Sequence, residues 1–239
     1  MTSASTAINI GNTAFILICA SLVMLMTPGL SFFYGGLVGR RNVLSIMIQS
    51  FISLVWTTVL WFTFGYSMSF GPTLGGIIGD PTTYALLRGV SLTTMYVGNN
   101  AGIPLIAHIA YQMMFAIITP ALITGAFANR VTFKAYFIFL TACLIFVYFP
   151  AVHMVWSADR LFAMWGVLDF AGGIVVHTTA GMAALASVFY VGSRTFVEHK
   201  PHNVPLIALG TGLLWFGWYG FNAGSELAVD PRAVQFSNL

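Results

Sequence analysis

The stretch AFILICASLVMLMTPGLSFFYGGLV, residues 14–38, carries no charged side chain and is long enough to cross a lipid bilayer. A membrane-spanning helix needs about 20 mostly apolar residues to cross a hydrocarbon core about 30 Å thick. A transmembrane β-barrel would instead show segments of about 10 residues in which apolar and polar residues alternate. Five more long apolar runs follow the first, so the predicted helices cover residues 14–38, 43–70, 103–127, 131–156, 170–191 and 204–224.

The composition of the whole chain agrees with a membrane protein. Of its 239 residues, 58% are hydrophobic and only 6% are charged, whereas soluble domains carry about 25% charged residues. The deficit excludes an ordinary water-exposed surface, and the high hydrophobicity excludes disorder. A formal net charge of +3 is too small to indicate nucleic-acid binding. We therefore expect an all-α polytopic membrane protein in which residues 1–239 form a single transmembrane domain. Pro28 and Gly29 break the first apolar run.

The basic residues between the runs predict an orientation in the cell membrane. Loops on the cytoplasmic side carry an excess of Lys and Arg. The loops after the odd-numbered runs hold six of them, namely Arg40, Arg41, Arg130, Lys134, Arg194 and Lys200. The loops after the even-numbered runs and the tail hold Arg88, Arg160 and Arg232. This bias predicts cytoplasmic odd-numbered loops and an N-terminus outside the cell.

Two ionisable residues stand in the stretch DFAGGIVVHTTAG, residues 169–181. His177 follows Asp169 by eight residues, which is about 12 Å along a helix and close to the bilayer midplane. Ionisable groups at that depth are candidates for function, although a histidine that only joins two helices would show the same pattern. A neutral imidazole there can form hydrogen bonds or relay a proton. Asp169 suits the N-cap of the helix, and that role is compatible with attracting cations.

The stretch GWYGFNAGS, residues 217–225, places three side chains on one helix face. Trp218, Phe221 and Ser225 are spaced by three and four residues, so they are neighbours on a helix surface. A hydroxyl beside aromatic rings could line a pore mouth, but core packing or an interfacial aromatic belt fits the pattern equally. No Walker loop, HExxH, GxSxG or CxxC motif occurs. We therefore expect neither an enzyme nor a cofactor.

At this point the sequence resembles the ammonium transporter family, the Amt/Mep/Rh group. DFAGGIVVHTTAG and GWYGFNAGS carry the resemblance most specifically. Three further stretches support it in the same order along the chain: TPGLSFFYGGLVGRRNVLSIMIQS at 27–50, ITPALITGAFANRVTFKA at 118–135, and FPAVHMVW at 149–156. The resemblance implies eleven membrane helices, built as two inverted five-helix repeats plus a last helix. This chain would hold the first repeat and helix six.

The resemblance also implies roles for particular residues. The substrate-binding residues would be Trp156, Phe115 and Ser225, which recruit ammonium at the outer mouth, together with Trp218 of helix six. Phe115 and Phe221 would form a stacked gate. His177 would be the first pore histidine and would relay protons, with Asp169 and Gln112 as further pore residues.

The expected activity is transport. Ammonium would be bound at the aromatic outer site and deprotonated, and ammonia would pass an apolar pore lined by histidine, with methylammonium as a substrate analogue. The alternative is an ammonium sensor that controls a fused or partner signalling module. The family pairs its pore histidine with a second one on a later helix, which these 239 residues do not contain, so we expect them to be the N-terminal part of a longer chain. A homotrimer and a PII-type cytoplasmic regulator are further implications of the resemblance.

Overall fold

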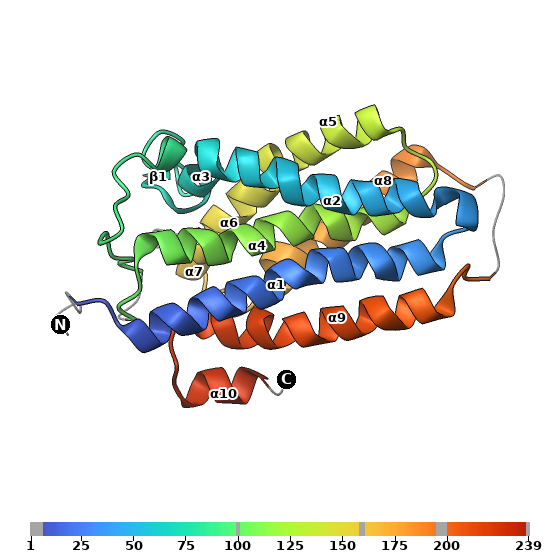
Figure 1. Cartoon of the computed structure of the whole chain (residues 1–239). Coiled ribbons are helices and arrows are strands. Elements are labelled where there is room, and N and C mark those ends of the chain that lie inside the picture. Colours follow the sequence, from blue (N-terminus) through green and yellow to red (C-terminus); the bar gives the residue numbers. More distant parts are fainter. Residues whose placement is uncertain (1–6, 99–100, 158–160, 195–199, 238–239) are drawn as a thin grey trace.

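The computed structural model describes residues 7–98, 101–157, 161–194 and 200–237. Its segments long and apolar enough to cross a membrane are Ile10–Leu37, Arg40–Phe70, Leu105–Phe127, Phe133–Trp156, Gly173–Val191 and Val204–Glu226. These segments run side by side along the length of the molecule (Figure 1). The predicted all-α polytopic fold is therefore confirmed.

Several of the spans contain more than one element. The α-helices are α1 (Ile10–Leu37), α2 (Val43–Leu60), α3 (Tyr66–Phe70), α4 (Leu105–Ile123), α5 (Phe133–Cys143), α6 (Phe149–Trp156), α7 (Leu161–Met164), α8 (Thr179–Val191), α9 (Val204–Ala223) and α10 (Pro231–Ser237). The 3₁₀ turns are η1 (Arg40–Asn42), η3 (Ala85–Leu87), η4 (Thr124–Phe127) and η7 (Gly224–Glu226). The π-helical turns are η2 (Trp61–Gly65), η5 (Leu144–Tyr148) and η6 (Gly173–Thr178).

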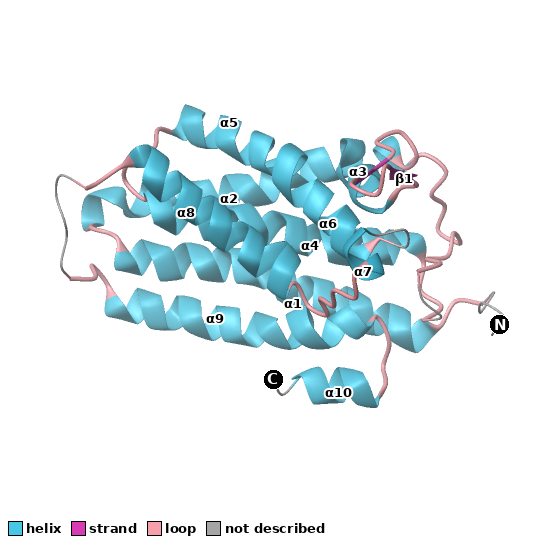
Figure 2. Ribbon diagram, turned by 180° about the vertical axis from the view of Figure 1, so that it is seen from behind, coloured by secondary structure: helices cyan, strands magenta, loops and turns pink. Residues whose placement is uncertain are grey.

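Helix α4 lies at the centre of the bundle. It packs against α1 and α2 on one side and against α8 on the other (Figures 1 and 2). In the span of α4, 72% of the most apolar stretch is buried inside the protein. The same share is only 17% in the span that contains α8 and 22% in the span of α9. The side chains of α4 are therefore enclosed by protein, while α8 and α9 each leave a broad face uncovered.

Side-chain caps mark where three of the spans begin. The side-chain oxygens of Asn9, Thr132 and Asn203 each accept a hydrogen bond from the backbone N–H three residues later. Such a bond satisfies one of the four N–H groups that have no partner within the first turn. Each polar loop residue thus fixes the point at which an apolar run becomes helical.

Pro28 and Gly29, which break the first apolar run of the sequence, do not break the helix. Helix α1 continues from Ile10 to Leu37 through Pro28 and Gly29 without a break. Proline is tolerated inside membrane helices because neighbouring helices and local adjustments satisfy the backbone groups that it frees. Gly29 here packs directly against α9, since a Cβ atom at this position would lie 2.9 Å from the Cβ of Leu213.

The first and last long helices pack most closely. A Cβ atom added to Gly36 of α1 would lie 2.7 Å from the carbonyl oxygen of Asn203, and one added to Gly210 of α9 would lie 2.6 Å from that of Gly29. Small residues of this kind allow two helix backbones to approach in a membrane. Glycine is thus required on both sides of the α1–α9 contact.

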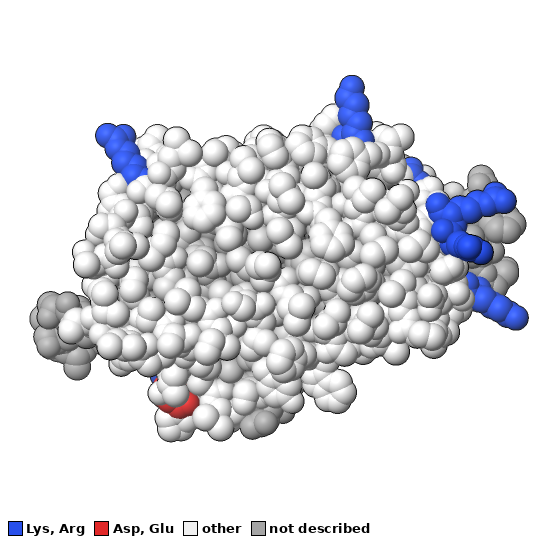
Figure 3. All heavy atoms as spheres, viewed as in Figure 1, with Lys and Arg blue, Asp and Glu red and all other residues white. Residues whose placement is uncertain are grey.

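The segment between α3 and α4 folds over one end of the bundle. It contains a two-stranded antiparallel sheet of β1 (Thr73–Leu74) and β2 (Ile78–Gly79). His153 of α6 holds this segment, because its Nδ1 lies 3.1 Å from the Ser69 carbonyl oxygen and its Nε2 lies 3.0 Å from the Thr73 hydroxyl. Lys and Arg side chains gather mainly toward the opposite end, where α1 ends and α9 begins (Figure 3).

Candidate functional site

A cavity of about 210 Å³ lies between α4, α6 and the end of α9. Five of the predicted site residues line it: Gln112, Phe115, Trp156, Asp169 and Ser225. The remaining lining residues are Phe70, Tyr96, His108, Phe170 and Leu227. We call it the outer cavity, because the predicted orientation places this end of the bundle outside the cell. Residues from four separate spans thus meet in one small space.

Trp156 and Phe115 form an aromatic corner of the outer cavity. Their ring centroids are 5.7 Å apart and the rings are nearly perpendicular, at 88°. The indole N–H of Trp156 donates a 2.9 Å hydrogen bond to the carbonyl oxygen of Asp169, which fixes the orientation of the ring. Aromatic faces attract cations with about 0.5–2 kcal/mol each. The corner is suited to a small cation.

Ser225 supplies a hydroxyl to the same cavity. It donates a 2.9 Å hydrogen bond to the carbonyl oxygen of Phe221, one turn earlier, so its own oxygen remains an acceptor. Tyr111, which the sequence analysis missed, lies behind it and donates to the carbonyl oxygens of Gly220 and Phe221 at 2.9 and 3.0 Å. This hydroxyl joins α4 to the end of α9. Its position one turn before Phe115 is the only signal that sequence offered.

A second cavity lies on the other side of Phe221. Its volume is about 400 Å³ and it opens widely to the surroundings. Three predicted residues line it, namely His177, Trp218 and Phe221, and Asp169 borders both cavities. We call it the histidine cavity.

Phe115 and Phe221 separate the two cavities. Their ring centroids are 4.4 Å apart with the rings tilted by 43°, and their side chains are 1% and 2% exposed. The rings are thus in contact, although tilted rather than stacked face to face. Phe221 then contacts His177 with centroids 5.8 Å apart, and His177 contacts Trp218 at 5.7 Å. The predicted gate and pore residues form one continuous row of rings.

Asp169 caps the helix that carries His177. Its Oδ1 accepts hydrogen bonds from the N–H groups of Gly172 and Gly173 at 2.7 and 2.9 Å. Its Oδ2 accepts from Ile174 and Val175, both at 2.9 Å. All four bonds are to backbone, and a carboxylate has about four acceptor positions. Asp169 is not the N-cap residue itself, which is Gly172; it lies three residues earlier and still satisfies the free N–H groups at the start of the helix.

His177 projects from the π-helical turn η6 into the histidine cavity and is exposed. Its Nδ1 lies 3.2 Å from the carbonyl oxygen of Gly172. Within the part of the chain that the structure describes, Nε2 has no hydrogen-bond partner. The hydroxyls of Thr178 and Thr179 instead donate to carbonyl oxygens five residues earlier, at 2.9 and 3.1 Å, which supports the widened turn.

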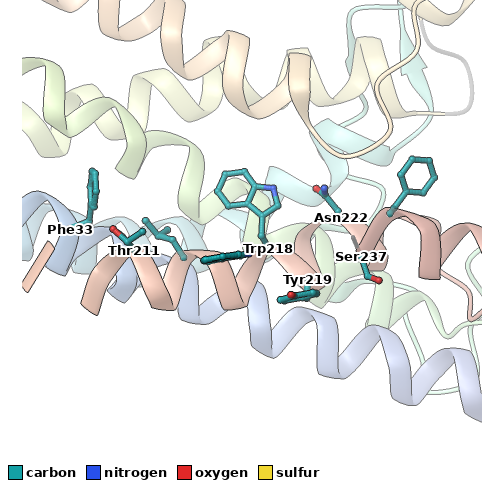
Figure 4. A pocket seen from close by; sticks show the side chains of 9 residues that line it. Phe33, Thr211, Trp218, Tyr219, Asn222 and Ser237 are labelled. Atoms are coloured by element: carbon teal, nitrogen blue, oxygen red, sulfur yellow. The ribbon is translucent and has the colours of Figure 1, made fainter. Parts of the chain in front are cut away.

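Trp218 also borders a shallow groove on the uncovered side of α9. Trp218 and Asn222 point to the same side of the helix, and Tyr219 points to the other (Figure 4). The groove has a volume of about 420 Å³. Because Trp218 is 38% exposed here, the described residues form only one wall of the space around His177.

Comparison with known proteins places these residues in context. The profile of the Ammonium Transporter Family matches residues 14–238. The chain is 47% identical to ammonium transporter 1 of Dictyostelium discoideum and 45% identical to ammonium transporter Amt1 of Archaeoglobus fulgidus, over 94% of its own length. It covers 49% and 55% of those two proteins, so it spans about half the length of these curated relatives.

Solved structures agree with the sequence comparison. The crystal structure of Mep2 from Saccharomyces cerevisiae superposes with a TM-score of 0.86 at 32% identity, over 97% of this chain and 52% of Mep2. A structure described as a sensor Amt protein superposes with a TM-score of 0.84 at 28% identity, over 94% of this chain and 56% of that protein.

Proposed function

Because this chain belongs to the ammonium transporter family, we propose that it forms half of a path through which ammonium is taken up and ammonia crosses the cell membrane. The observation that carries the proposal is the row of contacts from Trp156 through Phe115 and Phe221 to His177. This row connects a cavity suited to a cation with a histidine on the face of the bundle that the described residues leave open. The protein is a multi-pass membrane protein, and the path follows its length.

Recruitment is the first step of the proposed path. Ammonium and potassium have the same charge and a similar size, so a charged site would not separate them. Ammonium, however, donates hydrogen bonds. The hydroxyl oxygen of Ser225 accepts one such bond, while the rings of Trp156 and Phe115 hold the cation by cation–π attraction. Asp169, with its negative charge at the border of the cavity, adds to the attraction of cations.

Deprotonation is the second step. The closely packed rings of Phe115 and Phe221 leave no polar group to replace the hydration of an ion, and an unpaired ion in an apolar environment is very costly. The free-energy cost of moving neutral ammonia into the same environment is far smaller. On the inner side, the His177 imidazole offers a hydrogen bond and a group that can relay a proton.

The uncovered faces of α8 and α9 indicate where the rest of the path would be built. In the proposed complete protein, the second repeat covers His177 and Trp218 and supplies the second pore histidine. The N-terminus lies outside, and the basic end of the bundle seen in Figure 3 lies in the cytoplasm. Assembly as a homotrimer and control by a PII-type regulator belong to the same proposal.

Ammonium sensing is the second candidate. It is favoured by the match to the sensor Amt protein at a TM-score of 0.84. A sensor would use the same outer cavity but would pass the signal to a fused or partner module. Transport by the purified protein in the absence of any partner distinguishes the two.

The test of the proposed function is methylammonium uptake by the full-length protein in lipid vesicles. Trp156→Leu removes one aromatic wall of the outer cavity, so we expect the half-saturation concentration to rise about fivefold, the equivalent of about 1 kcal/mol, with the maximal rate retained. Trp165→Leu is the matched control, because Trp165 is 68% exposed, lies outside α8 and α9, and lines neither cavity. No uptake by the unmodified protein would refute transport, and unchanged half-saturation in Trp156→Leu would remove this residue from the site.

A further inference from the structure

A third histidine, His108 of α4, lines the outer cavity and has no part in the proposed path so far. It is 1% exposed and enclosed by aromatic rings. Tyr96 stacks on it with centroids 3.7 Å apart and an interplanar angle of 10°, and Phe70 meets it at 5.0 Å and 82°. The imidazole is therefore held rigidly at the cavity wall.

Tyr66 determines which ring nitrogen of His108 carries the proton. The Tyr66 hydroxyl lies 3.0 Å from Nδ1 of His108, and both side chains are buried. Among the described residues this hydroxyl has no other hydrogen-bond partner. A buried O–H that donates to nothing is costly, so it donates to Nδ1. The proton of the neutral ring is then on Nε2.

This tautomer makes His108 a hydrogen-bond donor toward the cavity. Tyr66 does not line the outer cavity, whereas His108 does. Over the described ranges Nε2 of His108 has no hydrogen-bond partner in the protein. This atom is also not among the fully buried polar atoms that lack a partner, so a small molecule can reach it. Gln112, one turn further along α4, lines the same cavity, and its Oε1 is buried without a partner. This carboxamide oxygen is an unpaired acceptor in a residue of the cavity wall, so it is free to take a hydrogen bond from a small donor.

The two forms of the substrate differ in what they can offer such a donor. Ammonium has four N–H groups and no lone pair, so an N–H donor repels it. Ammonia has one lone pair and three N–H groups. It can accept from Nε2–H of His108 and donate to the carboxamide oxygen of Gln112. Water has the same ability and would occupy the place when ammonia is absent.

We propose that His108 and Gln112 form a subsite for neutral ammonia beside the cation site, with Tyr66 as the positioning residue that fixes the His108 tautomer. The inference rests on the proposed function. Ammonium bound at Trp156 and Ser225 gives one proton to water, which becomes hydronium and leaves to the outer solution. The ammonia that remains is held by His108 before it passes the rings of Phe115 and Phe221. The outer cavity thus binds the cation on one wall and the neutral product on the other.

The first test is nitrogen NMR on full-length protein with ¹⁵N-labelled histidine. The His108 signals are assigned by their loss in His108→Gln. We expect a single tautomer protonated at Nε2, a shift of that signal when ammonia is added, and a mixture of tautomers in Tyr66→Phe. A His108 protonated at Nδ1, or one whose signal does not respond to ammonia, overturns the proposal. This measurement does not depend on transport.

The second test is methylammonium uptake in vesicles. His108→Leu removes the donor, so we expect the maximal rate to fall about tenfold while half-saturation stays unchanged. His108→Gln places an amide N–H near the original Nε2 and should stay within about twofold of the parent. His202→Gln is the control, since His202 is exposed and lines neither cavity. If the parent transports and His108→Leu transports equally well, the subsite is refuted while the proposed function stands. If the parent does not transport, the proposed function fails and the NMR result still decides the subsite.

Discussion

The rings of Phe115 and Phe221 lie with centroids 4.4 Å apart, and each lines a different cavity. Phe115 belongs to α4, the most enclosed helix, and Phe221 belongs to α9, which is bound to α4 by the Tyr111 hydroxyl. The partition between the cavities therefore includes two aromatic side chains in contact, held by helices that are hydrogen-bonded to each other. A barrier of this kind can be removed by a single substitution.

We predict that Phe221→Ala admits potassium. The change removes one of the two rings between the cavities, so water can accompany an ion across the partition. The measurement is the potassium current across a bilayer that contains the full-length protein. Phe216→Ala on the same helix is the control, because Phe216 is 55% exposed and lines neither cavity. A potassium current equal to that of the parent would count against Phe221 as a selectivity element.

His177→Ala should abolish most methylammonium flux with little effect on folding. In the described half of the path, its one hydrogen bond is to the backbone of its own helix turn. We expect the melting temperature to change by less than about 4 °C, the equivalent of about 1 kcal/mol. His177→Asp should replace ammonia passage with cation conduction, because it places a carboxylate in the pore. Equal losses of flux and stability in both variants would show that His177 only joins helices.

Asp169 should matter more for stability than for the flux itself. Asp169→Ala leaves four backbone N–H groups without an acceptor, so we expect the free energy of unfolding to fall by about 2–4 kcal/mol. Asp169→Asn keeps one carbonyl oxygen and should lose less. Asp80→Ala is the comparison, since Asp80 accepts from the Thr82 N–H in an exposed turn, a bond that lowers the pKa of its carboxyl. Thermal unfolding of the three purified variants ranks their stabilities. Equal losses of stability in Asp80→Ala and Asp169→Ala would contradict the capping role of Asp169.

Two glycines of α9 provide a matched pair for the contact with α1. A Cβ atom at Gly210 would lie 2.6 Å from the carbonyl oxygen of Gly29, whereas at Gly212 no atom lies within 4 Å. Gly210→Ala should therefore destabilise the protein by about 2 kcal/mol or more. Gly212→Ala should be neutral or stabilising by up to about 1 kcal/mol. Thermal unfolding in detergent compares them, and similar melting temperatures would refute tight packing at Gly210.

Sequence predicted the spans because a bilayer imposes one requirement on all of them, namely a long apolar run with internally bonded backbone. Sequence alone does not explain why α1 stays continuous through Pro28, because that depends on a helix far away in the sequence. The cap at Asp169 was readable, since its partners are the next few residues. The pairing of Tyr66 with His108 was not, because 42 residues separate them and only the packing of α3 on α4 brings them together. The roles proposed for Phe115 and Gln112 came from the family resemblance.

The close pairing of α1 with α9 also has a consequence for the time at which the bundle can close. Helix α9 begins at Val204, roughly 170 residues after α1 ends at Leu37. At a synthesis rate of about 5–20 residues per second, α1 waits roughly 10–30 s for its partner. During that interval the face of α1 that carries Gly29 and Gly36 has only lipid or a chaperone against it. A bulky substitution at Gly36 should therefore leave membrane insertion intact and fail later, when the last helix arrives.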